Sequence, residues 1–394
     1  MAEISPLPPL LVFADDWGRH PSSCQHLIGE LLDRHQVYWI NTIGMRTPRL
    51  DLATLRRGAE KLRHWFRRPR AEAQAVPNLR VLNPRMWPWF GSRFARWLNR
   101  QLLSRQLKAS LKSLVDAPIA VTTLPIVADL VGRLPVLRWV YYCVDDFGLW
   151  PGLDQQTLRQ MEESLVRKAD EVIAVSETLR DKLAQMGREA PVLTHGVDLD
   201  FWSGSENDPP ELQPLGALEG PLVVFWGVID RRMDVALVKQ LAADLVRGTI
   251  VLVGPEADPD PALYESPRVV HLPAMPFQHL PQLARHADVL IMPYADLPVT
   301  RAIQPLKLKE YLATGKPTVV RDLPAVRPWF DCLDLAQTPE EFSQAVRLRL
   351  ADGLPPAQKE ARRRLSEESW AAKARDFERW ALAPELNRHA VICS

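Results

Sequence analysis

The segment at residues 291–320 holds a lysine and a glutamate three positions apart, at the start of an expected helix. Pro305 suits the first helical position, and Gly315 suits a left-handed C-cap that ends the helix. Such a helix start offers free N–H groups and a positive dipole end to an anion, and Lys307 adds a full charge. The two oxygens of Glu310 could accept both hydroxyls of a ribose. The spacing predicts a nucleotide-diphosphate site; the alternative is a capped surface helix on which Glu310 only complements the dipole.

Signatures of several other enzyme classes are missing from the chain. No GxGxxG follows the first apolar strand pattern and no GxxxxGK[ST] occurs, which argues against nicotinamide dehydrogenases and P-loop nucleotidases. GxSxG and HExxH, which mark common hydrolases, are also absent. The four cysteines, Cys24, Cys143, Cys332 and Cys393, lie far apart, so neither a disulfide framework nor a zinc ribbon is expected.

The composition is that of an ordinary globular protein of 394 residues, with 46% apolar residues, 25% charged residues and a formal net charge of +1. This length suits two domains. No uncharged apolar run is long enough to span a bilayer, and the first 14 residues lack the basic region of a secretory signal. We therefore expect a cytoplasmic protein that is either soluble or peripheral to a membrane.

Short apolar strand patterns alternate with helical patterns, as in domains with parallel sheets. The predicted strands span residues 10–14, 37–40, 119–122, 139–143 and 171–175 in the first half, and 222–226, 250–253, 269–272, 289–293 and 318–320 in the second. Residues 204–220 contain prolines and acids without apolar periodicity and are predicted to be a linker. The predicted fold class is α/β, with Rossmann-like domains at residues 1–203 and 221–370 that face each other across a cleft.

Charge is distributed unevenly along the chain. Residues 46–112 contain 17 lysines and arginines against three acids, together with Trp65, Trp87, Trp89 and Trp97. Basic residues with interfacial tryptophans are typical of helices that lie on anionic membranes. The alternatives are a solvated basic helical face with core tryptophans, or a nucleic-acid surface, which no nucleic-acid motif supports. We expect possible membrane-surface contact here and no nucleic-acid partner.

The stretch PLKLKEYLATGKPTVV at residues 305–320 resembles the nucleotide-sugar motif of retaining glycosyltransferases with the GT-B fold. It looks closest to the family 4-like enzymes of bacterial cell-surface polysaccharide synthesis, including those of the teichuronic-acid type. Six further segments follow in the family's order: YYCVDDF at 141–147, ADEVIAVSETLRDKL at 169–183, HGVDLDFW at 195–202, FWGVIDRRMD at 225–234, LVGPE at 252–256 and SW at 369–370. The resemblance implies that the last helix, about residues 371–394, returns to the first domain, with Phe377, Trp380 and Leu382 as its packing face.

The resemblance also implies roles for individual residues. Glu310 would hold the donor ribose, and Arg231 and Arg232 would bind the diphosphate. The residues expected to bind the donor are Gly18, Arg19, Gly227, Arg231, Arg232, Pro273, Ala274, Met275, Pro305, Leu306, Lys307 and Glu310. The residues expected to act in catalysis are Asp145, Asp146, Arg231, Arg232 and Lys307.

Two positions depart from the family pattern. Ala302 stands eight residues before Glu310, where the family has a glutamate that contacts the sugar. Val228 stands where the family has an arginine just after the glycine. A polar loop replaces the glutamate in the related cell-surface subset, so Thr300, Arg301 or Gln304 are the candidates to contact the sugar here.

The predicted reaction transfers a hexose from a nucleoside diphosphate to an acceptor hydroxyl with retention. Cationic side chains would stabilise the departing diphosphate without a metal or cofactor. Asp145 or Asp146 would stabilise positive charge on the sugar; the alternative for this pair is strand-end capping or a surface turn. The expected acceptor is lipid-linked or a growing polysaccharide at the inner face of the cell membrane. The competing functions are a catalytically silent sugar-nucleotide- or partner-binding protein and a sugar-nucleotide epimerase.

Overall fold

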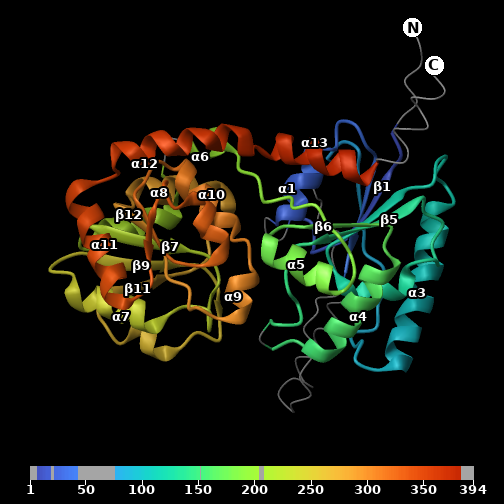
Figure 1. The fold of residues 1–394 in the computed structure, drawn as a ribbon, viewed down its shortest axis with the longest axis horizontal. Helices are drawn as coiled ribbons and strands as arrows, with labels where there is room; N and C mark the ends of the chain where they lie inside the picture. Colours follow the sequence, from blue (N-terminus) through green and yellow to red (C-terminus); the bar gives the residue numbers. More distant parts are fainter. Residues whose placement is uncertain (1–6, 19–21, 43–75, 151, 204–207, 383–394) are drawn as a thin grey trace, which may run out of the picture. The chain divides into compact units, whose positions relative to one another are not determined.

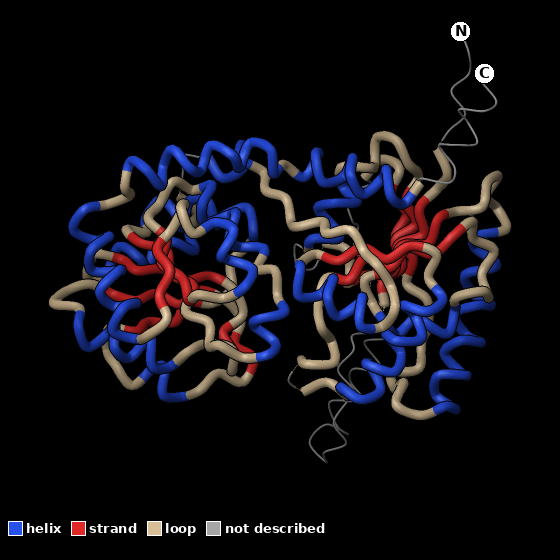
Figure 2. Tube along the Cα trace, viewed as in Figure 1, coloured by secondary structure: helices blue, strands red, loops and turns tan. Residues whose placement is uncertain are grey.

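The computed structural model describes residues 7–18, 22–42, 76–150, 152–203 and 208–382. The chain forms two compact units, residues 1–194 with 374–394 and residues 195–373. Each unit is built on one six-stranded sheet surrounded by helices, as Figures 1 and 2 show. The predicted α/β class with two parallel-sheet domains is confirmed.

The sheet of the first unit is parallel throughout, in the order β3-β2-β1-β4-β5-β6. Its strands are β1 (Leu10–Ala14), β2 (Val37–Asn41), β3 (Leu79–Leu82), β4 (Ile119–Thr122), β5 (Arg138–Cys143) and β6 (Glu171–Ala174). Its helices are α1 (Ser23–Gly29), α3 (Arg93–Leu111), α4 (Gln155–Lys168), α5 (Glu177–Gln185) and the 3-10 helix η1 (Pro125–Leu130). Doubly wound sheets of this order bind ligands beyond the carboxyl ends of the strands where the order reverses, here β1 and β4.

The second unit repeats the same strand order, as β11-β9-β7-β12-β13-β14. The strands are β7 (Leu222–Trp226), β9 (Thr249–Val253), β11 (Val269–Leu272), β12 (Val289–Met292), β13 (Thr318–Arg321) and β14 (Asp334–Ala336), with a separate pair β8 (Ile229–Asp230) and β10 (Glu256–Ala257). Strands β7, β9 and β12 are buried along their whole length, because helices cover both faces of a parallel sheet. The reversal point lies between β7 and β12.

Helices of both types connect these strands. The α-helices are α6 (Leu199–Ser203), α7 (Val235–Asp244), α8 (Leu280–His286), α9 (Pro298–Ala302), α10 (Leu306–Ala313), α11 (Pro339–Asp352), α12 (Pro356–Ala361) and α13 (Trp370–Ala381). The 3-10 helices are η2 (Pro210–Ala217), η3 (Pro261–Tyr264), η4 (Phe277–His279), η5 (Pro324–Trp329) and η6 (Arg362–Glu368). Helices α7 and α11 pack together, and the Ser343 hydroxyl donates to the Asp244 carboxylate at 2.6 Å. Among the described residues, none of the helices combines the length and apolarity that a bilayer crossing requires.

The predicted linker at residues 204–220 falls inside the second unit, since the division between the units lies at residues 194 and 195. Its described part includes η2, which buries Leu212 and Leu215 against the core of that unit. A composition rich in proline suggested a linker because proline interrupts helical periodicity, but proline is accepted at the start of a short 3-10 turn.

Helix α13 begins in the second unit, and its residues from Ala374 onward belong to the first, as the resemblance implied. Phe377 is fully buried, and its ring lies 6.0 Å from that of Tyr142 on β5. Glu378 accepts from Arg34 and lies 2.9 Å from Nε2 of His35. Of the predicted packing face, Phe377 and Leu382 are buried, and Trp380 is half-buried.

We expect Phe377→Ala to destabilise the first unit by about 3 kcal/mol, because the substitution leaves a cavity between α13 and β5. Urea unfolding of the full chain measures this change. Arg379→Ala, on the exposed side of the same helix, should change the free energy of unfolding by less than about 0.5 kcal/mol. Equal effects of the two substitutions would contradict the packing of α13 on the first unit.

Candidate nucleotide site in the second unit

Two glycines at neighbouring strand ends let the backbone and a lysine side chain come unusually close together. Gly227 follows β7 with a φ of 139°, and Gly254 follows β9 with a φ of 147°; L-residues with side chains rarely adopt either value. A Cβ atom on Gly254 would lie 1.9 Å from the carbonyl oxygen of Gly227. A Cβ atom on Gly227 would lie 2.1 Å from Nζ of Lys307. Glycine is therefore required at both strand ends for Lys307 to reach this point.

Lys307 is held in place by aromatic residues. Its ammonium donates to the Tyr294 hydroxyl at 2.8 Å and lies 4.4 Å from the centre of the Phe225 ring. Phe225 is a buried residue of β7, and Tyr294 follows β12. Because the strand order reverses between β7 and β12, the Lys307 ammonium lies at the strand reversal of this sheet. Within the described part of the chain, no carboxylate forms a salt bridge with Lys307, so its positive charge can serve an anionic ligand.

Glu310 is the second component of the site and lies one helical turn after Lys307. Only 7% of the residue is exposed. Burial raises the pKa of its carboxyl group to about 7, while the Lys307 charge and the Trp226 side chain oppose that rise. The Trp226 indole N–H is itself buried and lacks a partner at normal hydrogen-bond geometry in the described residues. The Glu310 carboxyl group and the Trp226 indole N–H are thus buried near each other, and protein contacts do not fully offset the cost of burying them. This is expected of groups that meet a polar ligand.

Helix α10, which carries both residues, is anchored through its other face. Nζ of Lys309 is buried and donates to the carbonyl oxygen of His195 and to the Glu368 carboxylate. Burial lowers the pKa of Lys309 to about 8, and the Glu368 charge opposes that fall. The ring of His195 lies 6.3 Å from that of Trp370, in agreement with a packing role rather than a catalytic one. These contacts fix the position of α10 and therefore of Lys307 and Glu310.

The start of α10 differs by one position from the prediction. Pro305 is the N-cap, and Leu306 is the first helical residue. Pro305 is buried, has an extended backbone and provides no side-chain cap to the helix N–H groups. The uncapped helix start lies beside Lys307 and adds the positive end of the helix dipole to its charge.

The two arginines predicted to bind the diphosphate are both engaged with carboxylates. Arg232 is buried, and its guanidinium contacts Asp230 at 2.8–3.0 Å while lying 5.8 Å from the centre of the Tyr294 ring. Arg231 is exposed and reaches Asp258 and Asp260 at 3.3–3.5 Å. Arg232 therefore shares Tyr294 with Lys307, whereas Arg231 extends toward the loop after β10. Asp230 was not among the predicted site residues, although its position two residues before Arg232 permits this pairing.

Three residues expected to bind the donor lie in the loop after β11, which shares the carboxyl edge of the sheet with the loops after β7 and β9. Pro273 and Ala274 are exposed, and Met275 packs partly against the core. Phe277, at the end of this loop, stacks on Phe201 with ring centres 4.8 Å apart. The loop after β11 is therefore exposed at Pro273 and Ala274, and the stacking of Phe277 on Phe201 holds its far end.

The candidates for sugar contact differ in how far the fold already uses them. The Thr300 hydroxyl accepts from the backbone N–H of Leu297 and lies within hydrogen-bond distance of the Ala295 and Leu297 carbonyl groups. Arg301 forms a two-bond ion pair with Asp296. Gln304 is buried, and within the described residues its side-chain amide forms no hydrogen bond. Of the three, Gln304 is the candidate whose polar group the fold does not already use.

The described site residues that were predicted in the first unit follow β1 and β5. Gly18 has a φ of 74°, and its N–H donates to Gln25; Arg19 lies outside the described residues. One oxygen of Asp146 accepts from the Gly148 N–H at 3.1 Å and lies 2.9 Å from Nζ of Lys182. Asp145 is half-buried in the same turn.

A buried network that the sequence analysis missed supports Asp146. Glu162 is fully buried and accepts from the Tyr141 hydroxyl at 2.8 Å and from Lys182 at 2.5 Å. Its position on the apolar face of α4, next to Met161, was the available signal. Lys182 also contacts Asp146, so Asp146 belongs to this network and has a structural role in addition to the predicted catalytic one.

The described residues contain no group of three or more His, Cys, Asp or Glu side chains arranged to hold a metal ion. Independence from metals stays a prediction.

Comparison with known proteins supports the fold. No family model matches the chain. The chain is 30% identical over 180 residues to a Bacillus subtilis (strain 168) protein named as teichuronic acid biosynthesis glycosyltransferase TuaH. This match covers 43% of the chain and 45% of the relative, so it spans less than half of the relative's length. The expected similarity to glycosyltransferases of this type is thereby confirmed.

Solved structures share the architecture over nearly the whole chain. Sucrose-phosphate synthase from Thermosynechococcus elongatus has a TM-score of 0.69 at 16% identity and covers 98% of this chain and 100% of its own. HepE of Anabaena, solved with UDP-glucose, has a TM-score of 0.60 at 16% identity, with 95% of each chain covered. The trehalose 6-phosphate synthase of Burkholderia multivorans has a TM-score of 0.62 at 14% identity and covers 98% and 100%. These similarities confirm the GT-B fold.

The pKa of Glu310 leads to a prediction about stability. The folded protein keeps a proton on Glu310 at pH values where the unfolded chain has lost it. The stability that this proton contributes is therefore present at low pH and is lost as the pH rises through about 7. Glu310→Gln cannot ionise, so the variant should gain about 2–3 kcal/mol relative to the unchanged protein between pH 5 and pH 8. Chemical unfolding at the two pH values measures this gain; a difference independent of pH would show that the carboxyl group is ionised at little cost.

Proposed function

We propose that the protein is a glycosyltransferase that moves a sugar from a nucleoside diphosphate to an acceptor hydroxyl. The observation that carries the proposal is the buried, incompletely compensated Glu310 beside the Lys307 ammonium, at the strand reversal of the second sheet. A carboxyl group there would receive two ribose hydroxyls, and the ammonium would meet the diphosphate. The donors bound in solved neighbours, such as UDP-glucose in HepE, make uridine nucleotides the first donors to test.

In this reaction the bond between the anomeric carbon and the phosphate oxygen breaks, and a bond from that carbon to the acceptor oxygen forms. Negative charge grows on the departing diphosphate, where Lys307 and the uncapped start of α10 would stabilise it. Glu310 would fix the position of the donor through the ribose. With retention of configuration, a phosphate oxygen takes the acceptor proton, so no protein base is required. The roles predicted for Asp145 and Asp146 remain predictions, and Asp146 already accepts a hydrogen bond from Gly148.

The acceptor class is part of the same proposal. The B. subtilis relative is named for teichuronic acid biosynthesis, which supports a cell-surface polysaccharide as acceptor. A lipid-linked acceptor stays a prediction. Transfer to such an acceptor would take place at the cytoplasmic face of the membrane. The basic stretch at residues 46–112 is predicted to contribute membrane contact, although residues 43–75 lie outside the described part of the chain.

A catalytically silent sugar-nucleotide-binding protein is the second candidate. Ala302 is buried and has no polar group for the sugar, and Val228 offers no charge to the diphosphate. Both functions require nucleotide binding, so turnover distinguishes them. Release of free epimerised sugar nucleotide would instead support an epimerase.

A thermal-shift screen with UDP-, GDP-, dTDP- and ADP-sugars should raise the unfolding temperature by several degrees with one of them, because a ligand of the native state stabilises it by mass action. Incubation of that donor with polysaccharide or lipid-linked acceptors should then release the nucleoside diphosphate. Stabilisation without turnover of any donor would favour the silent protein. No stabilisation by any nucleotide would contradict both functions.

Removal of the charge at either end of α10 provides a matched comparison. Lys307→Ala should weaken binding of the selected nucleoside diphosphate by roughly 10- to 100-fold, because it removes a charge-assisted hydrogen bond. Lys316, beyond the other end of the helix, donates to the carbonyl oxygen of Arg285, and Lys316→Ala should change affinity by less than about twofold. Calorimetric titration measures both affinities, and equal losses would argue against a diphosphate at the start of α10.

A further inference from the structure

Helix α3 of the first unit has two contrasting faces. Its buried residues recur every four positions, at Ala95, Asn99, Leu103, Leu107 and Leu111. The opposite stripe has helical spacings of three and four and is exposed throughout. We call this stripe the outer face of α3; it consists of Phe94, Trp97, Gln101, Arg105 and Lys108.

The first part of the outer face is aromatic. Phe94 is 68% exposed and Trp97 is 47% exposed, and their rings stack with centres 5.9 Å apart. Among the described residues, the exposed large aromatic side chains are Trp87, Phe94, Trp97 and Phe330, so three of the four lie within residues 87–97. Exposed apolar groups that gather in this way mark an interaction surface.

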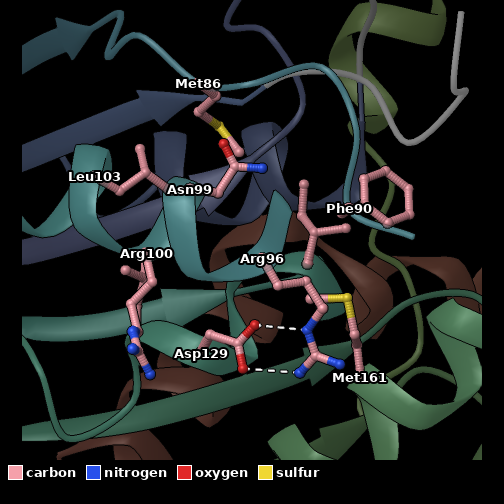
Figure 3. A pocket seen from close by; sticks show the side chains of 10 residues that line it. Met86, Phe90, Arg96, Asn99, Arg100, Leu103, Asp129 and Met161 are labelled. Atoms are coloured by element: carbon pink, nitrogen blue, oxygen red, sulfur yellow. Dashed lines mark hydrogen bonds and ion pairs between the residues drawn. The ribbon is translucent and has the colours of Figure 1, made fainter. Parts of the chain in front are cut away.

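The second part of the outer face carries positive charge that the described residues do not neutralise. No Asp or Glu occurs between residues 72 and 116, a stretch that holds eight lysines and arginines. Arg96 is paired with Asp129 through two bonds of 2.8 Å, and the two side chains line a pocket together with Met161 (Figure 3). Arg105 and Lys108 form no ion pair within the described part of the chain.

The positive surface continues past the end of α3. An open hollow of ≈ 600 Å³ lies there, and Lys108, Lys112 and Arg133 line it together with a single acid, Asp116. The hollow borders Pro118, directly before β4, so it belongs to the amino-terminal edge of the first sheet. This edge is opposite to the carboxyl edge at which doubly wound sheets bind their nucleotides.

We propose that the outer face of α3 binds the surface of an anionic lipid bilayer. The helix would lie in the plane of the interface, with Phe94 and Trp97 at the boundary between headgroups and acyl chains and with Arg105 and Lys108 on lipid phosphates. From Phe94 to Lys108 the face extends about 21 Å, which is enough to contact several lipids. The outer face of α3 carries aromatic residues and then cations, and it contains no acid. This pattern complements a bilayer surface, in which apolar acyl chains lie beneath negatively charged headgroups. This inference deepens the proposed function, because it assigns the membrane contact predicted for residues 46–112 to one face of α3. Vesicle binding tests it without any sugar transfer.

Co-sedimentation of the full chain with vesicles tests the proposal. The unchanged protein should bind vesicles of phosphatidylcholine with phosphatidylglycerol, bind weakly to phosphatidylcholine alone, and release at high salt. Phe94→Ala with Trp97→Ala should weaken binding by about tenfold or more. Arg105→Glu with Lys108→Glu should weaken it by about 25-fold or more, because each basic residue near such a surface accounts for about fivefold. Both pairs are exposed, and thermal unfolding of each variant would confirm that it folds.

Matched controls come from the second unit. Phe330 is 68% exposed, like Phe94, and Lys359 is an exposed cation; Phe330→Ala and Lys359→Glu should leave vesicle binding within about twofold. A loss below about tenfold in either α3 double variant, or no vesicle binding by the unchanged protein, would overturn the proposal. So would a dimer that Phe94→Ala with Trp97→Ala converts to monomers, or binding of single-stranded RNA in preference to vesicles. None of these results depends on sugar-nucleotide turnover.

Discussion

A carboxyl group that the fold buries without full compensation is the constraint on which the candidate site depends. Glu310 is kept from water, with Lys307 as its nearby positive charge and the Trp226 indole as a further polar neighbour. Burying an ionisable group in this way costs free energy that packing elsewhere in the second unit must offset. In the proposed complex, two ribose hydroxyls would donate to the Glu310 carboxylate and offset that cost, while the diphosphate would meet the Lys307 ammonium.

The backbone makes this arrangement possible before any side chain contributes. The strand order places the ends of β7, β9 and β12 side by side, and the glycines after β7 and β9 allow those ends to touch. The space that a Cβ atom would fill at Gly227 is occupied by Nζ of Lys307. Lys309 anchors α10 through its hydrogen bonds to the His195 carbonyl oxygen and the Glu368 carboxylate. These bonds fix the position of the helix and therefore of Lys307 and Glu310.

The first unit shows the same strand order with a different use of buried charge. Glu162 is at least as buried as Glu310, but Tyr141 and Lys182 both donate to it. Its network is complete without a ligand, so its role is structural. The contrast shows that two units with the same strand order can compensate a buried carboxyl group to different degrees.

The sequence was sufficient to predict the parts of the fold that follow from local pattern. The buried strands and the helix ending at Gly315 were predicted, since apolar runs and turn residues are local signals. Strand β3 was missed because it is a short, half-exposed edge strand without an apolar run. The partners of Arg232 and Lys307, Asp230 and Tyr294, depend on loop geometry and on strands distant in sequence. The 3-10 helix η2 was predicted to be part of a linker because its segment is rich in proline. The burial of Leu212 and Leu215 depends on contacts with residues distant in sequence.

The most direct measurement is a crystal structure of the full chain with the nucleoside diphosphate that stabilises it most. The account predicts electron density for the ribose with both hydroxyls within hydrogen-bond distance of the Glu310 carboxylate. It also predicts the diphosphate at Lys307 and the first N–H groups of α10. Density for the ligand at another place, with the surroundings of Glu310 unchanged from the free protein, would contradict it.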